Sequence, residues 1–231
     1  MERVRVPFPR SRQVPAMVQV PAALGLLETT GFTPAMVALD AMEKAARIEI
    51  IQAELNDALG VVLKIAGDVA NVSRAIETGR EWAERMGGKP SAQVISRPTP
   101  DIWPVVDGPR EVNPLIQQEV VHRPADRAKG DRSVSDSAEG SALGFIETQG
   151  FTAVFQAIDT ACKAANVEVL GKEKLGGGYV TIVIRGDVAA VAAAVESGKR
   201  QVEGLGKLIA AHVIPRPSAS VLALLPPAIG K

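Results

Sequence analysis

The sequence predicts an α/β fold, an α+β sandwich of ferredoxin-like type, built twice in one chain. Segments that begin at Leu24 and Leu143 nearly repeat each other, and the register holds at an offset of 119 residues as far as Pro98 and Pro217. Roughly 30 of about 75 aligned positions are identical, which is too many for chance over one unbroken register. Each copy also shows the same order of patterns: strand, helix, strand, strand, helix, strand.

The elements of the second copy can be placed one after another. A short apolar run at 142–147 predicts the first strand, and apolar residues at helical spacing over 151–165 predict an amphipathic helix. Runs of β-forming residues at 167–170 and 179–184 predict a hairpin, because three glycines follow Leu175 between them. The second copy is therefore expected to contain a hairpin with a glycine tip.

The second helix of each copy begins at an aspartate. Asp187 is the expected N-cap of a helix from Val188 to about 203, because a side-chain oxygen at that position accepts an otherwise unpaired backbone N–H. Asp68 is the matching cap in the first copy. A last strand at 208–214 is expected to end at Pro215.

We therefore divide the chain into four parts. They are an extended N-terminal arm rich in Pro and Arg, a first domain, a Pro-rich and then charged linker that we expect to be at least partly disordered, and a second domain. Their bounds are 1–21, 22–103, 104–140 and 141–231. Lobes of about 80 residues bury only about 60 % of their unfolded surface, so association is an expected part of their stability.

Composition excludes several classes of protein. Lys plus Arg and Asp plus Glu both total 26, so the chain lacks the basic surface of a nucleic-acid binder. The single cysteine, Cys162, excludes an intramolecular disulfide and a cysteine-rich metal site, and we expect it to be a small buried apolar residue. Neither a signal peptide nor an apolar run of membrane-spanning length is recognisable, so we expect a soluble, cytoplasmic protein with no membrane partner.

Several local motifs coincide at this point. Glu-Thr-x-Gly ends the first strand at Glu28 and Glu147, and Asp-x-x-x-Lys-Ala-Ala lies on the first helix at 40–46 and 159–165. Lys-Leu-Gly-Gly-Gly-Tyr-Val begins at Lys174, and both copies end in Arg-Pro. Together these motifs resemble the shell proteins of bacterial microcompartments, in particular the tandem-domain, trimer-forming class with unpermuted element order. The resemblance covers most of the chain, about 22–103 and 141–227.

The resemblance implies a structural role. In that family single domains form flat hexamers that tile into a polyhedral shell, with a pore on the sixfold axis. Two domains per chain imply a homotrimer of the same outline, a pseudohexamer, that assembles with other shell proteins and lets small metabolites pass. No enzymatic activity and no cofactor are implied.

Four basic residues correspond to the edge of the tile in this family: Lys44, Lys163, Arg97 and Arg216. A lysine stem can lie on a neighbouring surface while its ammonium group donates to backbone carbonyls, and an arginine beside proline projects a planar fork. The alternative is ordinary solvated lysines late in a helix, where cations are favoured, and solvent-exposed arginines at a strand exit. Recurrence in both copies favours the edge.

The hairpin tips correspond to the family's pore loops. Gly176, Gly177 and Gly178 would let backbones crowd around an axis, although three glycines alone also suit an ordinary turn. The first copy has Asn56, Asp57 and Ala58 in this region, so a trimer would have threefold pore symmetry. Three Asp57 carboxylates would disfavour anions; alternatively, Asp57 caps its own turn.

Two other functional classes stay open. Duplicated ferredoxin-like lobes also serve as regulatory modules that bind small ligands between lobes. An enzyme is the weaker alternative, because we find no catalytic triad, no phosphate loop and no paired carboxylates, and His122 and His212 lack evident metal or catalytic partners. Neither hairpin contains a cysteine, so we expect no iron–sulfur cluster of the kind found in some tandem shell proteins.

Overall fold

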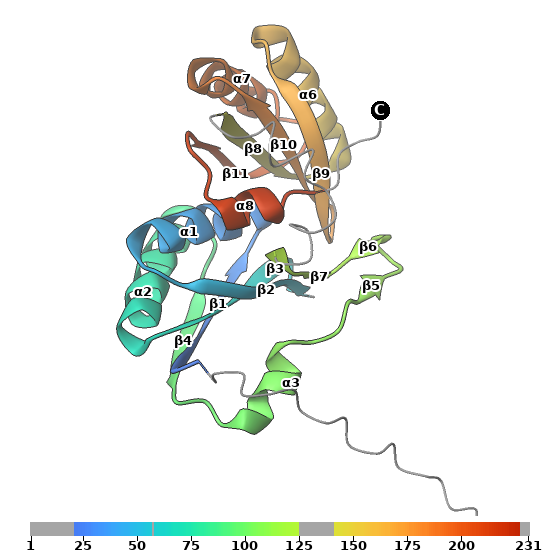
Figure 1. The fold of residues 1–231 in the computed structure, drawn as a ribbon. Helices are drawn as coiled ribbons and strands as arrows, with labels where there is room; N and C mark the ends of the chain where they lie inside the picture. Colours follow the sequence, from blue (N-terminus) through green and yellow to red (C-terminus); the bar gives the residue numbers. More distant parts are fainter. Residues whose placement is uncertain (1–20, 57, 125–140, 227–231) are drawn as a thin grey trace, which may run out of the picture.

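The computed structural model describes residues 21–56, 58–124 and 141–226, and it folds the chain into two lobes of one design (Figure 1). The predicted fold class is confirmed. Nearly all of the predicted N-terminal arm, and Asp57 in the first hairpin tip, lie outside the described residues.

The first lobe is a sheet with two helices packed on one face. Its elements are β1 (Ala23–Thr30), α1 (Phe32–Ala45), β2 (Glu49–Asn56), β3 (Gly60–Gly67), α2 (Val69–Arg85) and β4 (Ser91–Ser96). The strands pair antiparallel in the order β4-β1-β3-β2, which is the ferredoxin-like order.

The second lobe repeats this plan. Its elements are β8 (Ala142–Gln149), α6 (Phe151–Ala164), β9 (Glu168–Gly176), β10 (Tyr179–Gly186), α7 (Val188–Arg200) and β11 (Lys207–Ile214), with the order β11-β8-β10-β9. The predicted strand at 167–170 continues to the hairpin tip, because β10 supplies a partner along its whole length. Helix α7 ends three residues before the predicted end, and a run of turns follows it.

The predicted aspartate caps are present. The Asp68 carboxylate accepts the backbone N–H of Asn71 at 2.9 Å, and the Asp187 carboxylate accepts that of Ala190 at the same distance. The hydrogen bond from Asn71 also lowers the pKa of Asp68. Each cap fixes the first turn of a helix that lies across its own sheet.

The helices lie close to the sheets they cover. A Cβ atom built on Gly144 of β8 would lie 2.7 Å from side chains of Val191 and Val195 on α7. Only glycine allows that approach, so α7 packs directly on the strand backbone. The opposite side of each sheet, which we call its open face, carries neither of these two helices.

Part of the predicted linker is folded. Residues 99–124, which we call the insert, contain the short helices η1 (Pro100–Ile102) and α3 (Trp103–Val106) and the strands β5 (Val112–Asn113), β6 (Gln118–Glu119) and β7 (Val121–His122). Strand β7 pairs with β2 and extends the first sheet, which buries Val121 and His122. The sequence signal for these strands was weak, because each is only two residues long.

The two lobes pack in an asymmetric way. The open face of the second sheet lies on helix α1 of the first lobe, so that Leu143 and Phe145 share a buried cluster with Phe32 and Met36. The C-terminal helix α8 (Ala219–Ala223) also packs on α1 (Figure 1). A helix of one lobe thus covers a sheet of the other, and the described residues form no reverse contact of α6 on the first sheet.

Candidate functional site

The two hairpin tips meet each other. A Cβ atom built on Gly177 would lie 2.8 Å from Leu59 Cδ2, so the tip of the second lobe touches the tip of the first. Gly176, Gly177 and Gly178 all have positive φ, between 54° and 87°, as does Leu59 at 62°. The structure therefore brings the two predicted pore loops side by side at one place.

Asn56 organises the tip of the first lobe. Its amide oxygen accepts the backbone N–H of Ala58 at 3.0 Å and that of Gly60 at 2.8 Å, while its amide nitrogen donates to Glu28 at 2.6 Å. These bonds close a tight turn from within, as is typical of asparagine in loops. The candidate charge at this tip, Asp57, lies outside the described residues.

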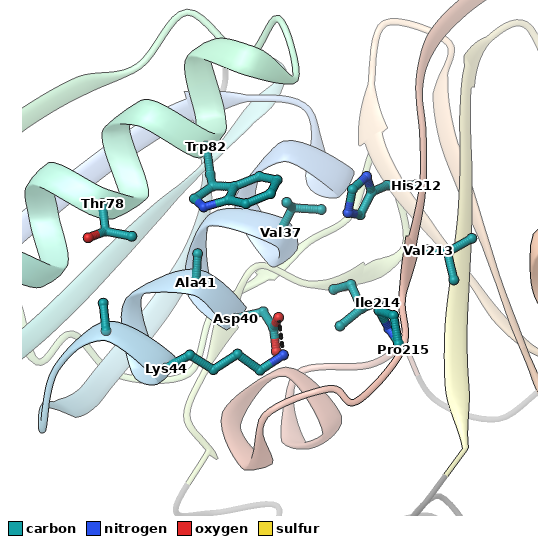
Figure 2. Close-up of a pocket in the computed structure, with 11 residues that line it drawn as sticks. Val37, Asp40, Ala41, Lys44, Thr78, Trp82, His212, Val213, Ile214 and Pro215 are labelled. Atoms are coloured by element: carbon teal, nitrogen blue, oxygen red, sulfur yellow. Dashed lines mark hydrogen bonds and ion pairs between the residues drawn. The ribbon is translucent and has the colours of Figure 1, made fainter. Parts of the chain in front are cut away.

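Lys44 lies at the junction of the two lobes (Figure 2). Its ammonium nitrogen lies 2.5 Å from the Asp40 carboxylate and 2.7 Å from the backbone oxygen of Arg216. The other Asp40 oxygen accepts the backbone N–H of Ser218 at 2.9 Å. A lysine and an arginine predicted for the same edge are thus brought together across the lobe boundary.

Lys163 occupies the equivalent position on α6, but no other lobe packs against it. It bonds Asp159 at 2.6 Å, and its side chain is 75 % exposed against 49 % for Lys44. Arg97, the equivalent of Arg216, has φ of 52° and donates its backbone N–H to Ala22. No described contact joins Lys163 to Arg97 within the chain.

Glu147 joins the two lobes, although the sequence motifs did not single it out as a site. Its carboxylate is fully buried and accepts the backbone N–H groups of Phe32 and Thr33, both at 2.9 Å. It thereby caps α1 of the other lobe, and burial raises its pKa. The recurrence of Glu28 and Glu147 at one register was the signal that could have found it.

A cavity of about 430 Å³ lies between α1, α2 and β11 (Figure 2). Trp82 and His212 meet edge to face there, with ring centres 6.2 Å apart, and Arg85 stacks over Trp82. Burial lowers the pKa of His212. Among the described residues, no group of three or more His, Cys, Asp or Glu side chains is placed to hold a metal ion.

The expectation that Cys162 is buried is wrong. Its neighbour Ala161 faces the core of the second lobe, and the helical period therefore turns Cys162 outward, where it is exposed. Partial desolvation, with a smaller contribution from the Asp159 carboxylate, raises the pKa of its thiol.

Comparison with known proteins gives consistent matches. A family model described as the BMC domain matches residues 23–98 and 142–217. The carboxysome assembly protein CcmO of a Synechocystis species is 32 % identical over 212 residues, which are 92 % of this chain and 67 % of that protein. The bacterial microcompartment shell protein PduA of Salmonella typhimurium is 47 % identical over 90 residues, 39 % of this chain and 96 % of that protein. The shell protein EutM of Escherichia coli is 44 % identical over 85 residues, 37 % of this chain and 88 % of that protein.

One further observation concerns membranes. Over the described residues, every helix is too short or too polar to cross a bilayer.

Proposed function

Because the chain belongs to the BMC-domain family of microcompartment shell proteins, with two such domains in tandem, we propose that three copies form a pseudohexameric ring with a central pore. The ring would tile into the facet of a shell. The observation that supports this proposal is the asymmetric contact between the two lobes.

That contact leaves helix α6 free, and the open face of the first sheet stays exposed around Glu28. Helix α1 is covered by the second sheet, whereas its counterpart α6 is not: Phe32 and Met36 are buried, but the equivalent Phe151 and Phe155 are 44 % and 52 % exposed. A helix with two exposed phenylalanines suits the open face of another copy's first sheet. Repeating one head-to-tail contact closes a ring when the rotation fits.

The polar groups follow the same rule. Glu147 caps α1 within the chain, but Glu28, its equivalent, is exposed on the open face of the first sheet and accepts a hydrogen bond from Asn56. In a ring, Glu28 of one copy would cap α6 of the next at Phe151 and Thr152. Asp159 would likewise accept a backbone N–H just after Arg97 of the neighbouring copy, as Asp40 accepts that of Ser218.

The ring would place the paired tips at its axis and the paired lysines at its rim. The pore would be lined by Asn56, Asp57, Ala58, Gly176, Gly177 and Gly178, and tiling contacts would come from Lys44, Lys163, Arg97 and Arg216. Small metabolites would cross at the axis, where backbone amides offer donors. The chain would act as a shell component without catalysis of its own.

Native mass spectrometry tests the ring. We expect a species of three times the 24.2 kDa chain. Phe155→Glu should convert it to folded monomers, because a charge on the free helix opposes burial against the next copy. Val188→Glu is the matched control: Val188 and its counterpart Val69 are both exposed, so no lobe covers this position. A monomeric wild type, or equal loss of trimer in both variants, would contradict the ring.

The cavity between the lobes favours one second candidate, a regulatory protein that binds a small ligand. Its volume of about 430 Å³ lies within the range of small-molecule sites, and Trp82 offers a stacking surface. A monomer in native mass spectrometry whose Trp82 fluorescence responds to a metabolite would favour this candidate over the shell role.

A further inference from the structure

The insert is held firmly on the first lobe. Lys64 is buried beneath it and donates to the Val106 backbone oxygen at 2.9 Å and to the Glu54 carboxylate at 2.6 Å. Within the insert, Arg123 forms an ion pair with Asp107 at 2.8 Å, which ties the region after α3 to the region after β7. Since β7 also belongs to the first sheet, the segment between these anchors has a defined position rather than the freedom of a tether.

The hairpin of β5 and β6 lies beside the glycine tip of the second lobe. The Gln118 side chain donates to the Lys174 backbone oxygen at 2.6 Å and to the buried Glu173 carboxylate, both on β9. A Cβ atom built on Gly176 would lie 3.9 Å from Ile116 Cγ2. Figure 1 shows the hairpin projecting from the lobes at the end of β9. The insert therefore bridges from the first lobe to the second lobe's tip.

The turn of this hairpin presents an apolar side chain to solvent. The side-chain oxygen of Asn113 accepts the backbone N–H of Leu115 at 2.9 Å. The backbone oxygen of Asn113 accepts the backbone N–H of Gln117, also at 2.9 Å. Leu115 is 90 % exposed. Two turn hydrogen bonds hold this leucine outward beside the glycine tip, and burying its side chain against another apolar surface would contribute about 1.5–3 kcal/mol.

We propose that the three hairpins of the ring form a collar at one mouth of the pore, with Leu115 of each copy facing the equivalent residues of the other two. This inference rests on the proposed ring, because only a ring brings three hairpins to one axis. The collar makes the two mouths of the pore different. An apolar ring has no groups to replace the hydration shell of an ion, so this mouth favours small uncharged metabolites over hydrated ions.

Cysteine cross-linking tests the collar. Leu115→Cys is combined with Cys162→Ala, so that the introduced thiol is the only one in the chain. Because Cys162 is exposed, its replacement removes no core packing. A short bismaleimide should join two chains of each trimer, seen as a dimer band on a denaturing gel. The control is Val105→Cys, because Val105 is 77 % exposed and belongs to α3, which lies away from the β5–β6 hairpin in Figure 1.

The outcomes separate the collar from the ring. A trimer in native mass spectrometry without cross-linking at position 115, or with equal cross-linking at position 105, overturns the collar and leaves the ring intact. Absence of the trimer itself overturns the proposed function first.

A second measurement tests whether the collar selects against hydrated ions. Leu115→Ser should raise the potassium conductance of the trimer in planar bilayers several-fold over that of wild type. An unchanged conductance would show that Leu115 does not select against ions.

Discussion

The carboxylate of Glu147 in the second lobe accepts the backbone N–H of Phe32 in the first lobe at 2.9 Å, in a site fully closed to solvent. A helix N-terminus leaves several N–H groups without partners, and here another domain supplies the acceptor. The contact therefore joins local helix capping to the docking of the lobes. Glu28 has the same motif position and remains exposed, as expected if the proposed ring completes its contact with α6 of the next copy.

Glu147→Ala should destabilise the folded chain by about 1–3 kcal/mol, because it leaves two buried backbone donors without an acceptor. Chemical denaturation of the monomeric Phe155→Glu background measures this free energy of unfolding directly. In the same background Glu28→Ala should change it by less than about 0.5 kcal/mol, as is usual at a surface position. Equal effects of the two substitutions would show that Glu147 does not cap across the lobes.

The raised pKa of Glu147 predicts a pH dependence of stability. Because the folded state holds this proton more tightly than the unfolded state, the contribution is full below the ordinary carboxyl pKa of 4.5 and is lost as pH rises through the higher folded pKa. Glu147→Gln should remove that slope. The free energy of unfolding of both proteins, measured against pH, checks this; parallel curves would contradict the assignment.

The sequence predicted the elements of each lobe well because their signals are local. Apolar spacing, the caps at Asp68 and Asp187 and the glycine tip each depend on a few neighbouring residues. The buried role of Glu147 depends on contact with a residue 115 positions away, so no local pattern records it. The same reason hid the insert: β7 is a strand only because β2 offers an edge.

The burial of Cys162 was misjudged for a related reason. Alanines surround it on both faces of α6, so the composition of the helix does not distinguish the face that packs from the face that is free. The counterpart of Cys162 in the first lobe, Glu43, accepts a hydrogen bond from Ser220 of α8. The same helix face is covered in the first lobe and free in the second. That difference arises from how the lobes pack, so the sequence pattern within one lobe does not predict it.

Gly177→Ala should destabilise the hairpin tip by more than the usual cost of placing alanine at a positive φ. Gly177 and Gly204 both have positive φ, 54° and 77°, so alanine at either position costs roughly 1–2 kcal/mol. A new Cβ meets Leu59 only at Gly177; at Gly204 nothing lies within 4 Å. The excess loss of stability for Gly177→Ala should shrink when Leu59 is also changed to alanine, and a double-mutant cycle measures this coupling. Zero coupling would mean that the two tips do not touch.

Removal of the two helix lysines should separate tiling from ring formation. Lys44 and Lys163 form exposed or half-exposed ion pairs with Asp40 and Asp159, and such pairs contribute only about 0–1 kcal/mol to folding. The double variant Lys44→Ala, Lys163→Ala should therefore keep the trimer in native mass spectrometry but lose the extended sheets or tubes that electron microscopy should show for wild type. Lys199→Ala is the matched control, because Lys199 forms a similar ion pair with Glu196 on a different helix. Sheets that persist in the double variant, or that also disappear in the control, would show that these lysines do not form the tile edge.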